Sequence, residues 1–329
     1  MTASNRFNGL TPYLVRSLGN LAASRNKGAG RICIFNYHRV LEEPDPLFER
    51  EPDGEEFRWQ MELLARCFNV LPLDVAMRAL ACGDVPPRAI CITFDDGYRN
   101  IHDVALPILK EYNLPATVFV TTGSIDGGRM WNDTITESVR RLPGKALDLR
   151  DIGLSVYATA SLEDKRRLID TLIVHAKYLP PEGRGVITRK LEDLISAPLP
   201  DMMLSRGMIA TLAREGIDIG AHTVSHPILT HVDDAQAREE IRRGKLQLEE
   251  ITGKTVRHFA YPNGKPEIDF NKRHVQMVKD AGYAAAFTTE FGPATARHDR
   301  FHLPRSRPWD TTPFLFTSRL LTWLAGRVV

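Results

Sequence analysis

Apolar, strand-like runs alternate with helical segments along most of this chain, and that alternation restricts the fold more than any other feature. We expect strands at residues 31–38, 68–73, 89–95, 116–121, 217–222, 258–262 and 284–289, with a short one at 301–304. The segments between them favour helices at 56–67, 74–82, 101–112, 205–215, 233–252 and 271–281. Alternating strands and helices over this length predict a parallel sheet, either open or closed into a barrel.

One block, residues 130–200, breaks the alternation. It contains no convincing strand, and residues 136–141, 161–178 and 185–195 favour helices. We therefore expect a helical insertion after the fourth strand, forming a cap over one end of the barrel rather than a separate domain. The predicted organisation is a basic, helical segment at 1–30, a barrel domain at 31–310 and an apolar, basic helix at 311–329.

Charge and cysteine usage narrow the class of protein. The 329 residues include 43 Lys and Arg against 41 Asp and Glu, so no global positive field favours nucleic acid. The four cysteines form no C-x-x-C pair, which fits reduced thiols in a reducing compartment. No run reaches the roughly 18 apolar residues of a membrane span, and the N-terminus lacks the apolar core of a secretion signal.

These features predict a cytoplasmic protein. Residues 6–31 carry basic residues and no acid, and residues 314–329 are apolar with two arginines. Either terminal segment could lie on a membrane surface, which would place the protein at the inner membrane face. Packing of both segments on the domain is the more common outcome for amphipathic helices.

Two adjacent carboxylates, Asp95 and Asp96, end the most apolar of the predicted strands and precede Gly97. Neighbouring residues on a strand point to opposite sides, and the glycine turn can aim each carboxylate differently. Separate surroundings push pKa values apart, so one carboxylate could bind a metal while the other moves protons. The alternative is an ordinary Asp-Gly turn with solvated side chains.

Two histidines, His222 and His226, follow another apolar run in the stretch AHTVSH. Two imidazoles in a short loop can close on one metal ion, and an Asp as third ligand would leave a coordination position open for water. Alone, such a pair is more often a surface or helix-capping pair. The Asp pair strengthens the interpretation of these histidines as metal ligands. The carboxyl ends of parallel barrel strands share one rim, where active sites lie.

Three stretches, TFDDG at 93–97, HTVSH at 222–226 and AYPNG at 260–264, resemble in order and separation the first three motifs of the polysaccharide deacetylase family. This is the carbohydrate esterase group with the NodB-type fold. The similarity covers residues 31 to about 308, and NYHRV at 36–40 and LPR at 303–305 resemble flanking segments of many bacterial members.

The resemblance implies an irregular (β/α) barrel of about seven strands that removes acetyl groups from N-acetylated sugars with a divalent metal, commonly zinc. By position, Asp96, His222 and His226 would hold the metal, and Asp95 would be the general base that activates water. The backbone N–H of Asn263 would stabilise the tetrahedral oxyanion together with the metal.

The chain departs from the family pattern at two places. Ala260 stands where many members have an Arg that pairs with the base, and Arg305 is a candidate substitute. The family's late Leu-x-Ile-His segment, which supplies the general acid, is absent. His302 is the nearest late candidate, although strand alternation could point it away from the pocket. His38 ends a strand on the same rim and could contact substrate or transfer a proton.

Aromatic and amide side chains near these motifs are candidates for sugar contacts, because rings stack on the apolar faces of pyranoses and amides reach hydroxyls. Packing in the core or at the rim is the alternative for each of them. The candidates are Tyr98, Thr121, Trp131, Asn132, Tyr261, Asn263 and Trp309.

We predict a metal-dependent carbohydrate deacetylase acting on a polysaccharide or on its lipid-linked precursor. One alternative is a hydrolase of small amides, such as a cyclic imide or a formyl-amino sugar. Another is a catalytically lapsed member that binds glycan within a synthesis complex.

Overall fold

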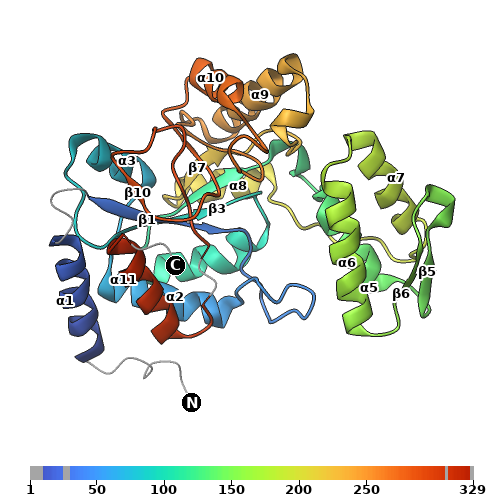
Figure 1. Ribbon diagram of the computed structural model, residues 1–329, viewed down its shortest axis with the longest axis horizontal. Coiled ribbons are helices and arrows are strands. Elements are labelled where there is room, and N and C mark those ends of the chain that lie inside the picture. The colour runs from blue at the N-terminus through green and yellow to red at the C-terminus, as the bar shows by residue number, and fades with distance from the viewer. Residues whose placement is uncertain (1–9, 25–29, 308–309, 327–329) are drawn as a thin grey trace.

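A curled sheet forms the centre of the computed structural model, which describes residues 10–24, 30–307 and 310–326 (Figure 1). Its strand order is β10-β1-β3-β4-β7-β8-β9, and β2 pairs with the start of β3. Every pair is parallel except β1 with β10. The strands are β1 (Arg31–Tyr37), β2 (Asn69–Val70), β3 (Ala89–Phe94), β4 (Thr117–Val120), β7 (Asp218–Ala221), β8 (His258–Ala260), β9 (Ala285–Phe287) and β10 (Ala294–Thr295).

Residues 303–306 link the two edges of the curl. Leu303 bridges to Phe287 of β9, and Ser306 bridges to Phe35 of β1. The Ser306 N–H donates to the carbonyl of Ile34 at 2.8 Å. The expected strand at 301–304 is thus a pair of isolated bridges, and the predicted irregular (β/α) barrel is confirmed.

Alternate residues along the strands face the inside of the barrel, as the period of two requires. Three side chains of α3 (Leu73–Cys82), Leu73, Ala76 and Leu80, join this inner cluster near the start of β3. The inner cluster is apolar and leaves the opposite, carboxyl end for polar groups. Its strand residues include Ile32, Ile34, Ala89, Cys91, Phe119, Ala260, Phe287 and Leu303.

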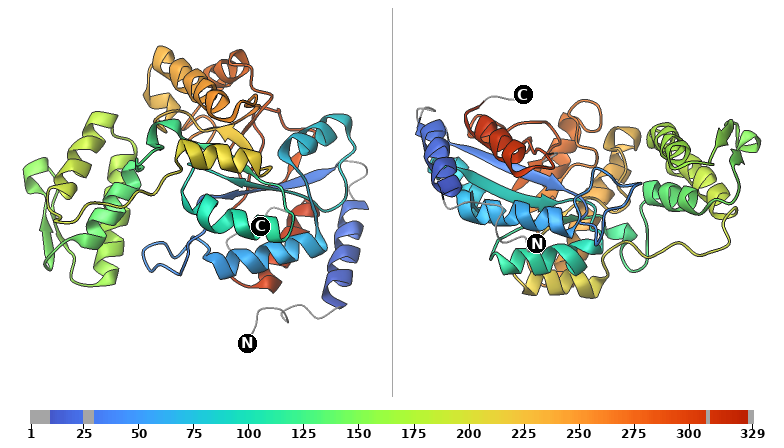
Figure 2. Two further views of the ribbon diagram at one scale, coloured as in Figure 1. Left: turned by 180° about the vertical axis from the view of Figure 1, so that it is seen from behind. Right: turned by 90° about the horizontal axis from the view of Figure 1, so that it is seen from below.

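Helices cover the outside of the sheet and share a larger apolar core with it (Figure 2). Local signals fix their ends. The Asp53 carboxylate accepts the Glu56 N–H at the start of α2 (Gly54–Cys67), and Gly253 ends α9 (Asp234–Thr252) with φ +64°. Residues 101–105 form a π-helical turn before α4. The remaining helices are α1 (Leu10–Ser24), α2 (Gly54–Cys67), α4 (Leu106–Glu111), α8 (Arg206–Arg214), α9 (Asp234–Thr252), α10 (Lys272–Asp280) and α11 (Pro313–Leu324).

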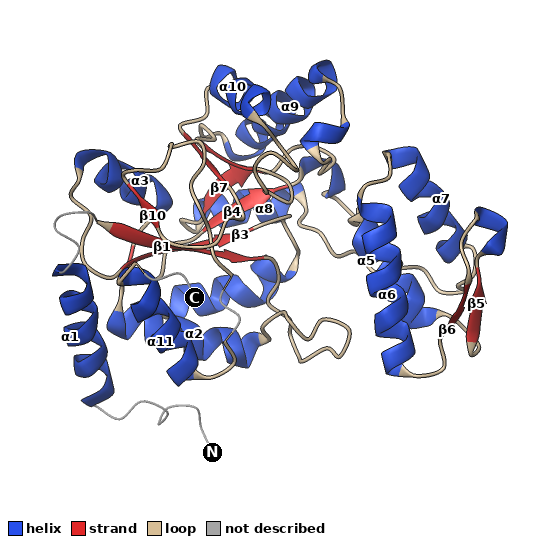
Figure 3. Cartoon of the chain, in the orientation of Figure 1, coloured by secondary structure: helices blue, strands red, loops and turns tan. Residues whose placement is uncertain are grey.

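The insertion forms a helical lobe with its own apolar core, centred on buried side chains such as Ile135, Leu172 and Leu191. Helices and a small hairpin make up this lobe (Figure 3). The hairpin corrects our expectation that this block contains no strand. The lobe consists of α5 (Trp131–Arg141), β5 (Ala146–Asp148), β6 (Val156–Ala158), α6 (Leu162–Lys177) and α7 (Pro181–Glu192).

The lobe lies beside the barrel on the side toward which β1 and β3 point (Figures 1 and 2). Arg39 forms a buried ion pair with Asp133 at the start of α5. Asp45, in the loop after β1, forms an ion pair at 2.6 Å with Arg140 of α5. At the base of the lobe, Arg129 Nη1 donates to the carbonyls of Leu199 at 3.2 Å and Pro200 at 3.1 Å, which joins the two ends of the insertion.

The terminal helices pack on the barrel. Helix α1 contacts α2 and α11, and α11 also packs on β1. None of the helices in the described ranges combines the length and the apolar character that crossing a bilayer requires. The four cysteines are free thiols, three of them buried.

Candidate metal centre and active site

Polar side chains continue the inner face of the barrel where its apolar residues end. Asn36 follows Ile32 and Ile34 on β1, Asp95 follows Cys91 and Thr93 after β3, and Arg305 follows Leu303. Each lies at the even spacing that keeps a side chain on the same face. The rim expected from the sequence therefore collects its polar groups at the carboxyl ends of the strands.

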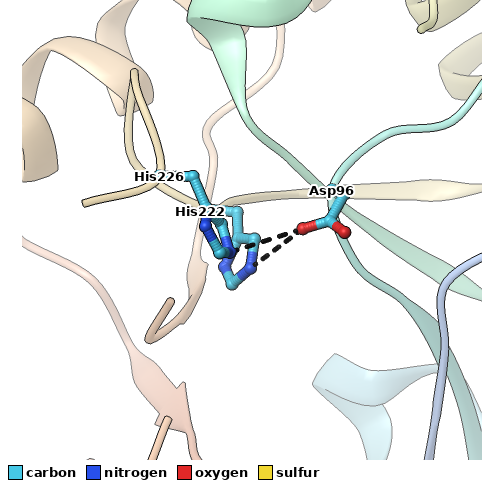
Figure 4. A group of neighbouring side chains, drawn as sticks. All are labelled: Asp96, His222 and His226. Atoms are coloured by element: carbon cyan, nitrogen blue, oxygen red, sulfur yellow. Dashed lines mark ion pairs between the residues drawn. The ribbon is translucent and has the colours of Figure 1, made fainter. Parts of the chain in front are cut away.

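Asp96, His222 and His226 converge at this rim (Figure 4). Asp96 Oδ1 lies 3.5 Å from Nε2 of His222 and 3.5 Å from Nε2 of His226. One ligand atom from each residue lies within 4.8 Å of the other two. The structure thus brings together the three residues that the family resemblance assigned to a metal.

The donor set fits a divalent metal such as zinc, which binds imidazole nitrogen and carboxylate oxygen. Asp96 Oδ1 is buried without a hydrogen-bond partner among the described residues. A buried carboxylate oxygen without a partner is costly, and a cation would satisfy it. Burial lowers the pKa of His222 and His226 to about 4, so both rings are neutral near pH 7, the form that binds metal.

Backbone contacts orient the first histidine ring. His222 Nδ1 lies 2.7 Å from the carbonyl oxygen of Ala260, an acceptor, so Nδ1 carries the proton and Nε2 is free for a ligand. Many family members have an Arg at position 260. In this chain Ala260 stands there and contributes to the site through its carbonyl group.

The loop that carries His226 is held by Glu240 of α9. One carboxylate oxygen of Glu240 accepts the N–H groups of Val224 and Ser225, both at 2.8 Å. His226 has φ +54° and Asp96 has φ +70°, a left-handed backbone that is uncommon outside glycine. Such conformations persist only where surrounding contacts hold them, so these two metal-ligand candidates are fixed by their loops.

Asp95 forms a bidentate ion pair with Arg305, with both N–O distances 2.7 Å. Arg305 also donates to the Thr93 hydroxyl at 3.1 Å and to the Thr288 carbonyl at 3.2 Å, and its side chain is fully buried. Burial raises the pKa of Asp95, but Arg305 outweighs it and, with His222 and His38, lowers that pKa to about 2. Asp95 is therefore ionised and held in one orientation.

His302 lies on the other face of the closing segment, because it directly precedes Leu303, which points into the barrel. Its ring packs 5.4 Å from the ring of Phe270, and its Nδ1 lies 3.9 Å from Asp299. This position does not favour the role of general acid expected for His302.

The aromatic candidates divide by exposure. Tyr98 is 2% exposed, with its ring 3.7 Å below the guanidinium of Arg39, and Tyr261 is fully buried and stacked on Phe270 at 3.7 Å. Neither offers a ring face to a sugar in this structure. Trp131 is partly exposed at the start of α5 and lines a cavity between lobe and barrel.

The remaining candidates lie at or near the rim. His38 has a buried Nδ1 without a hydrogen-bond partner among the described residues. Asn263 has φ +59°, and its backbone N–H donates to no described residue. The Thr121 hydroxyl donates to the His222 carbonyl, and Asn132 has a buried Oδ1. Trp309 lies outside the described residues.

Sequence reasoning missed two groups that hold the site, Asn36 and Glu240. With its amide oriented to satisfy its neighbours, Asn36 donates to Asp95 Oδ2 at 3.0 Å. The position of Asn36 two residues before His38, on the same strand face, was the available signal. Nothing local marked Glu240, since α9 carries many charged residues.

Comparison with known proteins places this geometry in a family. The family model for polysaccharide deacetylase matches residues 83–155 and 185–286. A Staphylococcus epidermidis poly-beta-1,6-N-acetyl-D-glucosamine N-deacetylase is 32% identical over 112 residues, which cover 30% of this chain and 38% of that enzyme. The match thus spans well under half the length of this curated relative.

Solved structures of low sequence identity show the same fold. The Streptococcus pyogenes deacetylase PplD, in complex with acetate, gives a TM-score of 0.60 at 20% identity and covers 90% of this chain and 99% of its own. IcaB from Ammonifex degensii gives 0.55 at 20% identity, covering 90% and 97%. Because the family model matches more than half of the residues, this chain belongs to the polysaccharide deacetylase family.

Proposed function

We propose that this protein is a metal-dependent hydrolase that removes acetyl groups from N-acetylated sugars of a polysaccharide or of its lipid-linked precursor. One observation carries the proposal: a carboxylate–imidazole cluster, whose buried Asp96 Oδ1 has no hydrogen-bond partner among the described residues, lies beside a second carboxylate that an arginine keeps ionised. The named activity of the Staphylococcus epidermidis relative, on poly-beta-1,6-N-acetyl-D-glucosamine, supports this substrate class.

Asp96, His222 and His226 would hold the metal, and zinc is the proposed ion because it suits one carboxylate and two imidazoles. When bound, the ion supplies positive charge that lowers the pKa of water and polarises the acetyl carbonyl. The fixed Nδ1–H of His222 and the Glu240-held loop keep the ligand atoms in place for it.

Asp95 would accept the proton of the attacking water. Arg305 and Asn36 hold the Asp95 carboxylate toward the rim and leave it no freedom to rotate away. The backbone N–H of Asn263, which has no acceptor within the described ranges, is the proposed donor to the oxyanion that develops on the acetyl oxygen.

His38 is the proposed donor of the proton that the departing sugar nitrogen needs. It lies at the inner, carboxyl end of β1, and its buried Nδ1 has no other described partner. His38 also lies close enough to Asp95 to stabilise its charge. The position of His302, whose ring packs on Phe270, favours it less for this role.

We propose that the protein is cytoplasmic. The reduced thiols agree with a cytoplasmic protein. Contact with the inner membrane face is proposed for an apolar surface on α1 and the start of α11, and sedimentation with anionic vesicles would test it. Its exposed side chains are Tyr13, Leu14, Leu18, Leu21, Phe314 and Leu315.

The decisive experiment measures acetate release from a panel of N-acetylated oligosaccharides and from a chromogenic acetyl ester. We expect release to stop on chelation and to return when zinc or cobalt is restored. A protein that retains metal and yet releases no acetate from any compound would contradict the proposal and favour a glycan-binding role.

His38→Gln tests the assignment of the proton donor in the same assay. It should slow release from an amide substrate, whose nitrogen must be protonated, far more than release from an ester with a good leaving group. Equal losses on both substrates would instead assign His38 to substrate binding.

A further inference from the structure

A cavity of about 270 Å³ lies between the helical lobe and the barrel, directly beside the metal site. Ser225 and Pro227, the two neighbours of His226, line one side of it, and Trp131 and residues of α7 line the other. In the proposed function the scissile acetyl group binds at the metal site, so this cavity lies where a neighbouring part of the same glycan would be held.

The charged residues that line the cavity are all basic. The ionisable members of the lining are Arg129, Arg184 and His231, and no Asp or Glu belongs to it. Arg129 has one distant acidic partner, Glu192 at 3.6 Å, and its Nε is buried without a hydrogen-bond partner among the described residues. The cavity therefore presents more positive charge than its surroundings neutralise.

Arg184 is the more unusual cation, because it is only 8% exposed. Its guanidinium donates to two carbonyls at the end of α6, Ala176 at 3.2 Å and Lys177 at 2.9 Å, and lies 5.1 Å from the ring of Trp131. No carboxylate of the described part of the chain forms an ion pair with it, and burial alone lowers its pKa. A buried cation without a counter-charge is costly unless a ligand supplies one.

We propose that this lobe cavity binds an anionic group carried by the N-acetylated sugar or by the sugar next to it, so that the substrate is an acidic glycan. The inference rests on the proposed function, whose substrate class it narrows. A carboxylate and a phosphate both suit two guanidinium groups, which donate planar pairs of N–H groups to such oxygens. Trp131 would cover an apolar face of the same sugar.

Thr188 offers a test that leaves both arginines in place. It lines the cavity and lies one turn after Arg184 on α7, the spacing at which helical side chains meet. Thr188→Glu would supply an internal carboxylate to Arg184 and compete with an anionic ligand. Thr188→Gln adds the same bulk without charge, whereas removing Arg184 would also uncap α6.

Binding is measured by calorimetry on the full, metal-loaded protein with three probes at low salt. The probes are a hyaluronan tetrasaccharide, which carries carboxylates, N-acetylglucosamine 1-phosphate, and neutral chitotetraose. We expect at least one anionic probe to bind about tenfold or more tightly than chitotetraose, a preference that charge-assisted hydrogen bonds readily supply. Which anionic probe prevails assigns the group as carboxylate or phosphate.

The variants complete the test. Thr188→Glu should abolish the preference for the anionic probe, and Thr188→Gln should keep it within about threefold of the wild type. The proposal is overturned if chitotetraose binds as tightly as both anionic probes, or if the two variants bind alike. Acetate release by the wild type from the N-acetylated oligosaccharides and the chromogenic ester separates the two proposals: anion binding by a metal-loaded protein that releases acetate from none of them would refute the deacetylase and leave the anion site standing.

Discussion

The barrel rim and the helical lobe face each other across the same cavity but are built differently. At the rim, buried charges are paired or gathered toward one point: Asp95 with Arg305, and Asp96 with two histidines. In the lobe, the core is apolar, and its buried cation Arg184 lacks a carboxylate partner among the described residues. The rim is arranged for chemistry, whereas the lobe leaves charge available to a ligand.

The family match does not divide along this line. The model for the family covers β3, β4, β7 and β8 of the barrel together with α5 and most of α7 of the lobe. It leaves out residues 156–184 of the lobe, and also β1 and the closing segment 303–306 of the barrel. Features shared with the family therefore occur in both regions.

Asp96→Asn should have the largest effect, because it removes the charged ligand of the rim. We expect metal affinity to fall by more than about 100-fold, since loss of outer partners alone costs roughly 10- to 100-fold. Metal content after dialysis and acetate release should fall together. Full metal content in this variant would remove Asp96 from the ligand set.

Asp95→Asn should separate the two adjacent carboxylates. Without its base the protein should lose on the order of 10²- to 10⁴-fold in kcat, while metal content stays at the wild-type level. If metal is lost as in Asp96→Asn, the two carboxylates share one role and the distinction between them fails.

Arg305→Gln tests whether the ion pair of Arg305 with Asp95 stabilises the fold and keeps the Asp95 carboxylate ionised. It leaves a buried carboxylate unpaired, so we expect a loss of about 3–5 kcal/mol in the free energy of unfolding near pH 7. The folded-state pKa of Asp95, about 2, lies below the unfolded value of about 3.9. The ion pair thus stabilises the fold above pH 4 and loses this effect as pH falls toward 2.

Urea unfolding of the wild type and Arg305→Gln at several pH values would measure this. The difference between them should be largest near neutral pH and shrink in acid. Loss of the arginine also raises the pKa of Asp95, so the acid limb of the pH–rate profile should move to higher pH. A constant difference across the pH range would mean that Arg305 stabilises by packing alone.

Leu172→Ala tests whether lobe and barrel unfold separately. Leu172 is fully buried in the lobe core, so the cavity should destabilise the lobe by about 2–5 kcal/mol. Hydrogen exchange should quicken in α5, α6 and α7 and stay unchanged in β3 and β7. Val174→Ala, at a site 70% exposed, is the matched control and should change little. Faster exchange throughout would show one cooperative unit.

His302→Gln should have the smallest effect, within about twofold in kcat, because surface substitutions away from the site are usually near neutral. A loss comparable to that of His38→Gln in amide hydrolysis would restore His302 to the pocket.

Most barrel strands could be predicted from the sequence because they lie in apolar runs, several of which end at a Gly or Pro. The hairpin β5–β6 and strand β10 were missed because each strand has only two or three residues, several of them exposed. Such strands lack the buried pattern on which prediction relies. The π-helical turn at 101–105 likewise has no distinctive local signal.

The site divides in the same way. The candidate metal ligands Asp96, His222 and His226 lie in two short motifs, and the resemblance of these motifs to the family was sufficient to nominate them. The contact of Arg305 with Asp95 joins residues 210 positions apart, and only the closing of the barrel brings them together. The direction of His302 depended on the register of a segment too short to fix by pattern.

The junction at Arg129 bears on how such a protein could have arisen. Because one guanidinium ties the chain at 129 to the chain at 199 and 200, the lobe leaves and re-enters the barrel at nearly the same point. A short turn could therefore replace it, and the same barrel could accept a different lobe without relocating a strand. If the lobe binds glycan as we propose, exchange of whole lobes between relatives would change the glycan recognised and leave the rim at Asp95 and Asp96 in place.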